Sequence, residues 1–390
     1  MKSSLLALPI AGAAALPGCN ISYANLMTDS MIRHGVEPHW HYDQATLYTS
    51  FEAIYELTGN ETLYDYYHGH VDGLVLDNGD IVDYNFTRYS LDNYRFGNNV
   101  LWFYKQTGEE KYKLAADKIL AAVLSHPRNP SGGLWHRIGV YPDQMWLDGI
   151  YMADSFYAKY VSEFQPDNQT AWDDIVLQYD LIDGRTRKEN NLLVHGYDES
   201  KKAVWADPVT GAAPLVWGRA VGWYFMSLLE TLAVLPKEHP GYERLMGYFV
   251  DLAEGLKGAQ DEKGGWWNVM EERYEDVEGN YLESSASVMF TFGWLRGLNL
   301  GILPKADYAE VAKKAYHAMI DLFVTWNDDG TINWEDTVMV GSLGSNATFE
   351  VCTPCPYSYS SCGCTHANQS SSTTLALVSD RTIFVAPAAS

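Results

Sequence analysis

The stretch IYELTGNETLYDYY, residues 54–67, ends one helix-like segment at Thr58 and begins another directly after it. The same arrangement returns in FYKQTGEEKYKLAA, residues 103–116, where Thr107 takes the place of Thr58. In both stretches a glycine ends the first segment and acidic or polar residues start the second, a pattern typical of two helices joined by a tight turn. The sequence therefore predicts a repeated helical hairpin.

Three later stretches show the same pattern of helix, polar break and helix. They lie at residues 164–177, 235–249 and 303–319. A period of about 50–65 residues with two helices in each unit indicates a helical array. Five or six hairpins fit in the chain, so we predict an all-α fold, an (α/α)6 barrel in which six hairpins form an inner and an outer ring. An open solenoid is the alternative, although solenoid repeats are usually shorter.

Aromatic, glycine-rich loops separate the predicted hairpins. In a toroid such loops gather at one mouth, where a binding site would form. They cover residues 131–137, 195–208, 261–269 and 329–334. Because no Ser/Gly-rich linker interrupts this pattern, we expect one catalytic barrel domain over residues 25–349.

The N-terminus has the features of a secretory signal peptide over residues 1–19. Lys2 is followed by an apolar run and then by small residues. The LPGC sequence that ends at Cys19 also resembles a bacterial lipid-attachment site. Asn-x-Ser/Thr sequons agree with a secreted, N-glycosylated protein, which is the location we expect. The sequons begin at Asn20, Asn60, Asn85, Asn168, Asn346 and Asn368.

Composition excludes several classes of partner. The chain of 390 residues carries a net charge of −23, which argues against nucleic acid and against an anionic membrane surface. A small anionic substrate remains compatible, because one or two arginines can reverse the potential within a site. Aromatic residues make up 14%, and Tyr and Trp suit sugar rings, although most will belong to the core.

The stretch YPDQMWLDGIYMAD, residues 141–154, places Asp148 among large apolar side chains. At helical spacing Asp148 would share a face with Met145, Tyr151 and Met152. Burial there would raise the pKa of the carboxyl group, and a carboxylic acid that keeps its proton can act as a general acid. A buried Asp tied to a backbone amide or an Arg explains the same pattern equally well.

Asp92, in SLDNYRFG, stands where a helix is expected to begin. It is either a first-turn Asp favoured by the helix dipole or a second carboxylate of the site. His195 and His136 could orient a carboxylate or a water molecule, although a lone His is more often structural.

Arg219 lies in the run WGRAVGWY, between Trp217 and Trp223. An Arg fork is the natural partner of a substrate carboxylate, and the indole rings could stack on a sugar. An Arg paired to a core acid is the alternative. Nothing in the sequence indicates a cofactor or a catalytic metal, since it lacks GxGxxG, P-loop, HExxH and GxSxG patterns.

Read in order, these motifs resemble the unsaturated rhamnogalacturonyl hydrolases of glycoside hydrolase family 105, from about Trp40 to Val340. The resemblance is carried by HPRNPSGGLWHRIGVYPDQMWLDGIYMADSFYAKY, HGYDES, WADPVTGAAPLVWGRAVGWYFMSLLETL, GGWWNVM and YLESSASVMFTFGWLRGLNLGIL. It implies an (α/α)6 barrel and a small oligosaccharide substrate that ends in an unsaturated galacturonyl residue. It also implies hydration of the C4=C5 double bond, after which the product opens and releases the neighbouring rhamnose-containing sugar. We expect a monomer.

The resemblance also implies roles for individual residues. Asp148 matches the catalytic acid and base, and Asp92 the second aspartate of the site. The substrate-binding positions are matched by His195, Arg219, Trp217, Trp223, His136 and Tyr42, where Tyr42 replaces a residue that is often Trp in relatives.

Three alternatives stay open. An unsaturated glucuronyl hydrolase would use the same chemistry on another sugar. A sugar 2-epimerase of the same toroidal fold would rely on paired histidines, whereas here the candidates are carboxylates and an Arg. A non-catalytic carbohydrate binder would tolerate the loss of Asp148.

The chain departs from the family pattern after about Phe349. Residues 350–390 are rich in Ser, Thr and Cys and lack helical periodicity. Four cysteines gather there and could hold a metal or form two disulfides: Cys352, Cys355, Cys362 and Cys364. Our hypothesis is that this tail is a gene-model artefact, either an unspliced intron or a frameshift.

Overall fold

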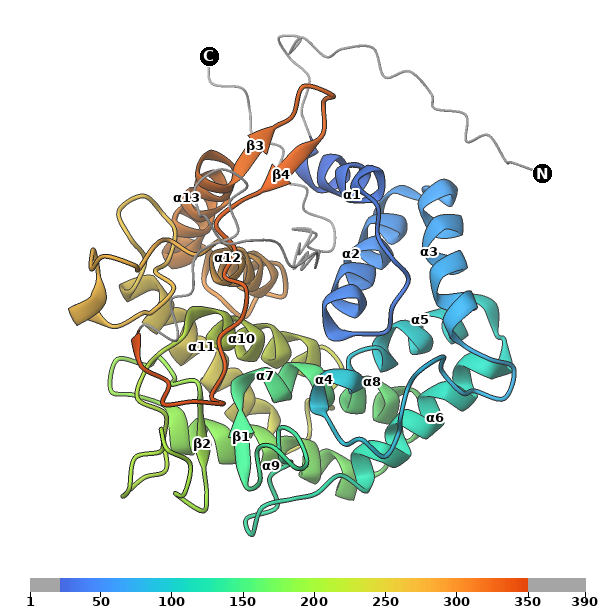
Figure 1. The fold of residues 1–390 in the computed structure, drawn as a ribbon, viewed down its shortest axis with the longest axis horizontal. Coiled ribbons are helices and arrows are strands. Elements are labelled where there is room, and N and C mark those ends of the chain that lie inside the picture. Colours follow the sequence, from blue (N-terminus) through green and yellow to red (C-terminus); the bar gives the residue numbers. More distant parts are fainter. Residues whose placement is uncertain (1–21, 350–390) are drawn as a thin grey trace.

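The computed structural model describes residues 22–349, and these residues form a ring of helical hairpins (Figure 1). The helices are α1 (Tyr23–His34), α2 (Tyr42–Thr58), α3 (Glu61–Leu74), α4 (Leu91–Tyr94), α5 (Gly97–Thr107), α6 (Glu110–Leu124), α7 (Leu147–Gly149), α8 (Ser155–Phe164), α9 (Gln169–Thr186), α10 (Gly218–Leu232), α11 (Tyr242–Gly258), α12 (Ser284–Asn299) and α13 (Lys305–Phe323). A π-helix, η1 (Ile150–Asp154), precedes α8, and a 3₁₀ helix, η2 (Glu272–Tyr274), precedes α12. Two antiparallel pairs join β1 (Gln144–Trp146) to β2 (Gly196–Asp198) and β3 (Val324–Trp326) to β4 (Ile332–Trp334).

Five hairpins follow one another around this ring: α2–α3, α5–α6, α8–α9, α10–α11 and α12–α13. The first helix of each pair contacts the first helix of the next, which makes an inner ring, and the second helix covers it from outside (Figure 1). All five breaks predicted from the sequence are found. Helix α1 contacts α2 and β4. Residues 350–390, with the four tail cysteines, lie outside the described residues, as does the predicted signal peptide.

The repeated sequence produces a repeated helix end. The Thr58 and Thr107 hydroxyls each donate a hydrogen bond to the carbonyl four residues earlier, at 2.7 and 2.9 Å. Gly59 and Gly108 follow with φ of 64° and 71°, the left-handed conformation that glycine adopts without a steric penalty. The same Thr-Gly pair thus ends both α2 and α5, which confirms the predicted hairpin turns at these residues.

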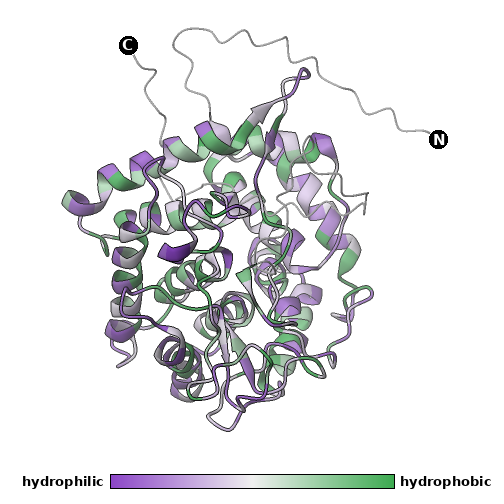
Figure 2. Cartoon of the chain, turned by 60° about the vertical axis from the view of Figure 1, so that its left-hand side comes forward, coloured by the Kyte–Doolittle hydropathy of each residue, from purple (hydrophilic) through white to green (hydrophobic). Residues whose placement is uncertain are grey.

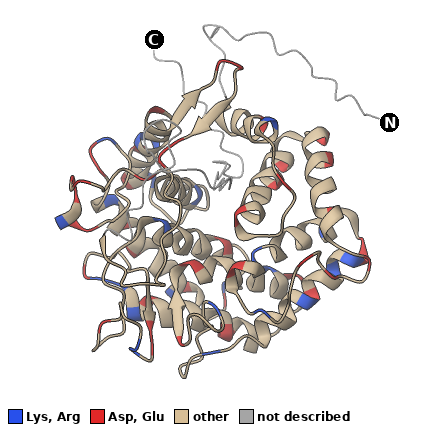
Figure 3. Ribbon diagram, in the orientation of Figure 1, with Lys and Arg blue, Asp and Glu red and all other residues tan. Residues whose placement is uncertain are grey.

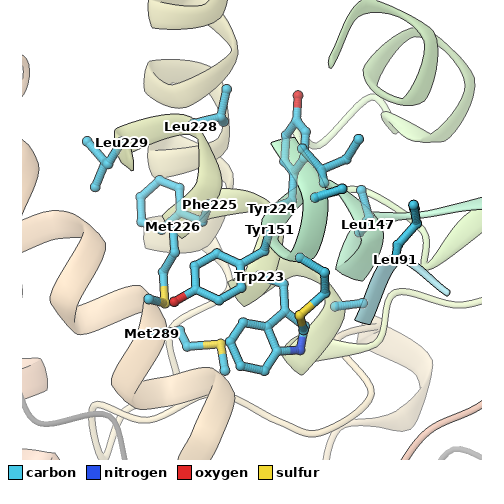
Figure 4. Close-up of a cluster of buried hydrophobic side chains, with 14 of the residues drawn as sticks. Leu91, Leu147, Tyr151, Trp223, Tyr224, Phe225, Met226, Leu228, Leu229 and Met289 are labelled. Carbon is cyan, nitrogen blue, oxygen red and sulfur yellow. The ribbon is translucent and has the colours of Figure 1, made fainter. Parts of the chain in front are cut away.

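Apolar side chains fill the space between the rings. Helices α10 and α12 are buried along almost their whole length, whereas α11 buries only one face. Figure 2 shows helices at the surface that carry both hydrophobic and hydrophilic residues. Figure 4 shows part of this core, where Tyr151 lies against Trp223 and Met289 packs beside the indole. Charged residues lie mainly on the outer helices and loops (Figure 3). Within residues 22–349, no helix is long and apolar enough to cross a membrane.

A carboxyl group lies fully inside this core. The Glu52 side chain on α2 accepts hydrogen bonds from the Tyr67 hydroxyl at 2.5 Å and from the Asn99 amide at 2.7 Å. Burial raises the pKa of Glu52 to about 7, although both donors oppose the shift. The pKa is thus higher in the folded chain than in the unfolded one. Its contribution to stability is therefore complete at low pH and is lost as the pH rises through about 7.

We expect Glu52→Gln to remove this loss, because the Gln oxygen can accept both hydrogen bonds without a charge. Between pH 5 and pH 8 the wild-type free energy of unfolding should fall by roughly 3 kcal/mol more than that of the variant. Urea unfolding at the two pH values measures the difference. The control is Glu56→Gln, at an exposed position one turn later on α2. Equal pH slopes for wild type and Glu52→Gln would contradict the expectation.

Candidate active site

Short β-bridges tie three of the predicted loops together where the inner helices begin. Ser90 pairs with Arg137, β1 pairs with β2, and Trp217 pairs with Val269. The backbone N–H of His136 also donates to the carbonyl of Gln144 at 2.8 Å. Loops 131–137, 195–208 and 261–269 therefore lie next to one another at this end of the ring.

The fourth predicted loop behaves differently from the other three. Residues 329–334 form the turn of the β3–β4 hairpin and its second strand, which pack against α1. Asp329 forms an ion pair with Arg33 at 2.9 Å, and the N–H of Ile332 donates to the Ser30 hydroxyl at 2.9 Å. This segment is therefore part of a local β-hairpin that packs on α1. Its aromatic residue was not a sign that the loop joins the other three.

The β1–β2 pairing brings Asp148 and His195 together. The N–H of Leu147 donates to the His195 carbonyl at 3.0 Å, and His195 Nε2 lies 3.1 Å from Asp148 Oδ2. The strands approach closely because Gly196 has no side chain: a Cβ there would lie 2.5 Å from the Met145 carbonyl oxygen. Although these two site residues are 47 positions apart, the register of a three-residue ladder fixes their contact.

Two expectations about Asp148 were wrong. Met145 lies on strand β1 and not on a helix with Asp148, and helix α7 begins only at Leu147. The pKa of Asp148 is also lowered: burial raises it, but the charge and hydrogen bond of His195, helped by His136, outweigh burial. The sequence indicated His195 as a residue that could orient a carboxylate, but not its contact with Asp148, because the two residues lie on different loops.

Asp92 has its own cationic partner. Arg137 Nη2 donates to Asp92 Oδ2 at 2.6 Å, and His136 Nε2 lies 3.7 Å from Oδ1. Asp92 is in the first turn of α4, as expected from the sequence, and Ser90 donates to the same carboxylate at 3.4 Å. Both carboxylates of the site therefore have basic neighbours. Their side chains stay slightly open, at 14% exposure for Asp148 and 10% for Asp92.

The Trp146 indole joins the two pairs. His136 stacks on it with ring centroids 4.2 Å apart and an interplanar angle of 11°, and His195 meets it at 5.4 Å. Burial lowers the pKa of His136, which the charge of Asp92 opposes. His136 Nδ1 is buried and has no hydrogen-bond partner within residues 22–349. This imidazole is therefore held by stacking more than by hydrogen bonds.

Arg219 is enclosed by the protein in this structure. Its Nε donates to the Ser285 hydroxyl at 2.7 Å, and its side chain is only 4% exposed. Its two terminal nitrogens donate to the carbonyls of Val338 and Met339, and one lies 3.6 Å from Glu283. The geometry matches the alternative of an Arg paired to a core acid. Binding of a substrate carboxylate by Arg219 stays a prediction.

The predicted aromatic positions are near the carboxylates but well covered. Trp217 is 2% exposed and its ring lies 4.9 Å from that of His195. Trp223 is 1% exposed and meets the half-buried Tyr42 edge-on at 6.4 Å. Burial raises the pKa of Tyr42 to about 12, with smaller effects from Arg219 and the two site carboxylates. Tyr42 is therefore within electrostatic range of both carboxylates.

Sequence reasoning missed three residues of this cluster: Arg137, Trp146 and Glu283. Arg137 directly follows His136, and Trp146 stands two residues before Asp148, so the motifs LWHR and QMWLDG contained both. Glu283 is fully buried and accepts from the N–H groups of Ser285 and Ala286 at the start of α12. A Glu before a Ser-Ser pair was the available sequence signal. Among residues 22–349, no group of His, Cys, Asp or Glu side chains is arranged to hold a metal ion.

Comparison with known proteins agrees with this arrangement. A glycoside hydrolase from family 105 of C. acetobutylicum ATCC 824 has a TM-score of 0.81 at 34% identity, covering 85% of this chain and 93% of its own. Unsaturated rhamnogalacturonyl hydrolase YesR of Bacillus subtilis (strain 168) is 23% identical over 303 residues, which are 75% of this chain and 78% of the relative.

A more distant likeness concerns the fold alone. The unsaturated glucuronyl hydrolase from Bacillus sp. GL1 has a TM-score of 0.60 at 12% identity, covering 85% of this chain and 94% of its own. Together the structural likenesses confirm the predicted (α/α)6 barrel. The model of Glycosyl Hydrolase Family 88 matches residues 22–360. The chain therefore belongs to Glycosyl Hydrolase Family 88.

Proposed function

We propose that this protein is an unsaturated uronyl hydrolase that acts on rhamnogalacturonan fragments left by a polysaccharide lyase. The pairing of Asp148 with His195 is the observation that carries the proposal, because it gives a nearly buried carboxylate a neighbour that can hold or release a proton. Similarity to YesR supports an unsaturated galacturonyl residue linked to rhamnose as the substrate.

The proposed reaction begins with proton transfer from the Asp148 carboxyl group to C4 of the unsaturated uronyl ring. Positive charge develops at C5 and is shared with the ring oxygen. Water then adds to C5, and the Asp148 carboxylate takes one of its protons, so the residue returns to its starting state. The product is a hemiketal at C5. Its C5–O5 bond opens to a ketone, which leaves a hemiacetal at C1 that expels the neighbouring sugar.

Substrate binding would raise the pKa of Asp148, so that its carboxyl group carries a proton when the reaction begins. The pKa of Asp148 is held down by the His195 charge, against the effect of burial. A uronate that enters the site adds a negative charge and displaces water, and both changes raise the pKa of a nearby carboxyl group. We therefore infer that Asp148 takes up a proton when substrate binds.

The second carboxylate has a different role in the proposal. Arg137 Nη2 donates a hydrogen bond to Asp92 at 2.6 Å and holds its carboxylate in place. A fixed negative charge near C5 would stabilise the positive charge that develops there and would orient the water. Asp92 therefore stabilises the reacting centre while Asp148 exchanges protons with it.

The test is the ultraviolet absorbance of the conjugated uronate during incubation with lyase-digested rhamnogalacturonan I. Loss of absorbance, together with release of a rhamnose-ended product, is the expected result. A parallel incubation with an unsaturated glucuronyl disaccharide decides between the two sugars. Unchanged absorbance on both substrates, from protein with a cooperative unfolding transition, would contradict the proposal.

A further inference from the structure

We propose that Trp40, Tyr84 and Phe86, here called the aromatic strip, form a subsite for a sugar that follows the reacting uronyl residue. The inference rests on the proposed function and extends it to longer oligosaccharides. None of these three residues was predicted from the sequence as a site residue, and none contacts Asp148 or Asp92 in the described hydrogen bonds.

The strip adjoins the site through two loops. Trp40 stands two residues before Tyr42, and their neighbour His41 contacts both rings, at 6.4 Å from Trp40 and 4.7 Å from Tyr42. Tyr84 and Phe86 belong to the segment that leads directly into α4 and Asp92. A sugar chain that leaves the reacting centre on this side would therefore pass over the strip.

The three rings contact one another in a row, with interplanar angles of 64° and 46°, and the polar atoms of Trp40 and Tyr84 are turned away. Tyr84 lies 4.8 Å from Trp40 and 4.7 Å from Phe86, between ring centroids. Trp40 Nε1 donates to the Val82 carbonyl at 2.9 Å, which joins the two loops. The Tyr84 hydroxyl is buried, so the part of this half-buried residue that meets solvent is carbon. Ring faces presented in this way suit the C–H faces of a sugar.

The backbone beside the strip is held in an uncommon conformation. Asp83 has φ of 56° and Tyr89 has φ of 44°, and a bulky residue such as Tyr rarely adopts a positive φ. The Tyr89 carbonyl is fixed by the N–H of Ile138 at 3.0 Å. Strained backbone persists where the surrounding structure over-determines it, often at ligand-binding segments. The rings are therefore presented by a rigid segment.

Nearby charge favours one kind of sugar. Asp43 lies 2.9 Å from His41, the neighbour of Trp40, and Asp83 directly precedes Tyr84, so two carboxylates lie beside the strip. Negative charge next to the rings would repel a uronate. The occupant we propose is accordingly an uncharged sugar ring, bound by stacking.

The experiment compares an unsaturated disaccharide with the unsaturated tetrasaccharide that carries the same reacting end. Trp40→Ala and, on the other loop, Phe86→Ala are expected to lower the tetrasaccharide-to-disaccharide ratio of kcat/KM about fivefold, the effect of losing about 1 kcal/mol of stacking. The control is Trp326→Ala, because Trp326 is 54% exposed on strand β3. Its ratio should not change. The protein should come from a host without N-glycosylation, since Asn85 of the strip segment begins a sequon.

Binding of the same two sugars to Asp148→Asn protein, measured by calorimetry, separates this inference from the proposed function. A higher affinity for the tetrasaccharide that is lost in Asp148→Asn/Trp40→Ala supports the strip even if neither sugar is turned over. Equal affinities, or equal losses for both sugars, would overturn it. Loss of turnover alone would count against the reaction and not against the subsite.

Discussion

Asp148→Asn is expected to lower kcat by about a thousandfold or more on the unsaturated uronide, because the amide can neither give a proton to C4 nor take one from water. Its oxygen can still accept a hydrogen bond from His195, so the fold and the neighbouring rings should be kept. Substrate affinity should change by less than about tenfold, since the lost interaction acts mainly in the transition state. Absorbance kinetics and calorimetry measure the two effects.

A neighbouring aspartate provides the matched control. Asp143 lies in the same segment with φ of 59°, a conformation that Asn also tolerates, and it does not contact His195 in the structure. Asp143→Asn should therefore keep wild-type turnover. Activity retained by Asp148→Asn would contradict the catalytic role and would leave the non-catalytic binder as the better interpretation.

Arg95→Met is expected to have the largest effect on stability. The Arg95 guanidinium is fully buried and donates to both oxygens of Glu230, at 3.1 and 3.3 Å. Its removal leaves Glu230 with Lys159, 2.9 Å away, as the remaining cation. Breaking a buried ion pair on one side costs about 3–5 kcal/mol, because the other charge stays desolvated. Urea unfolding at pH 7 measures the loss.

The pH dependence of stability gives a second readout of this pair. Burial raises the pKa of Glu230, but Arg95 and Lys159 together lower it to about 2. The pKa is below its unfolded value, so the stabilisation is complete above that value and is lost as the pH falls through about 2. In Arg95→Met this loss on acidification should shrink. The double variant with Glu230→Gln should recover part of the lost free energy at pH 7.

Stability and the site are linked through one aromatic stack. The Arg95 guanidinium lies 3.9 Å from the centre of the Tyr151 ring, and Tyr151 stacks on Trp223 at 4.7 Å (Figure 4). Trp223 in turn meets Tyr42. Arg95→Met should therefore also raise KM. The control Arg88→Met, at an exposed position, should change neither KM nor the free energy of unfolding. A destabilisation equal for both variants would contradict the account of the buried pair.

Local sequence determined the hairpins. A Thr-Gly pair ends α2 and α5 through short-range hydrogen bonds, and Asn168 begins α9 by accepting from the N–H of Ala171. These contacts join residues within four positions of each other, so the pattern alone contains them. The same reasoning correctly placed Asp92 in the first turn of a helix.

Long-range contacts were not available from any local pattern. The expected rise in the pKa of Asp148 was wrong because His195 approaches through the β1–β2 register and changes the balance between burial and charge. The sequence left Arg219 between a substrate carboxylate and a core acid, and it could not show that α12 and the chain near Val338 supply hydrogen-bond partners. Each motif contained the polar residue, but its partner in the folded protein comes from a distant part of the sequence.

The sequence by itself thus determined that this protein is a ring of helical hairpins and which loops carry its polar candidates, because turns and helix ends depend on residues next to each other. Only the tertiary structure decided that Asp148 pairs with His195, that Asp92 pairs with Arg137, and how far each is shielded from water. Ionisation depends on charges and solvent within a few ångströms in space. Those distances are set by the β1–β2 ladder and the Ser90–Arg137 bridge, which bring separate loops into contact.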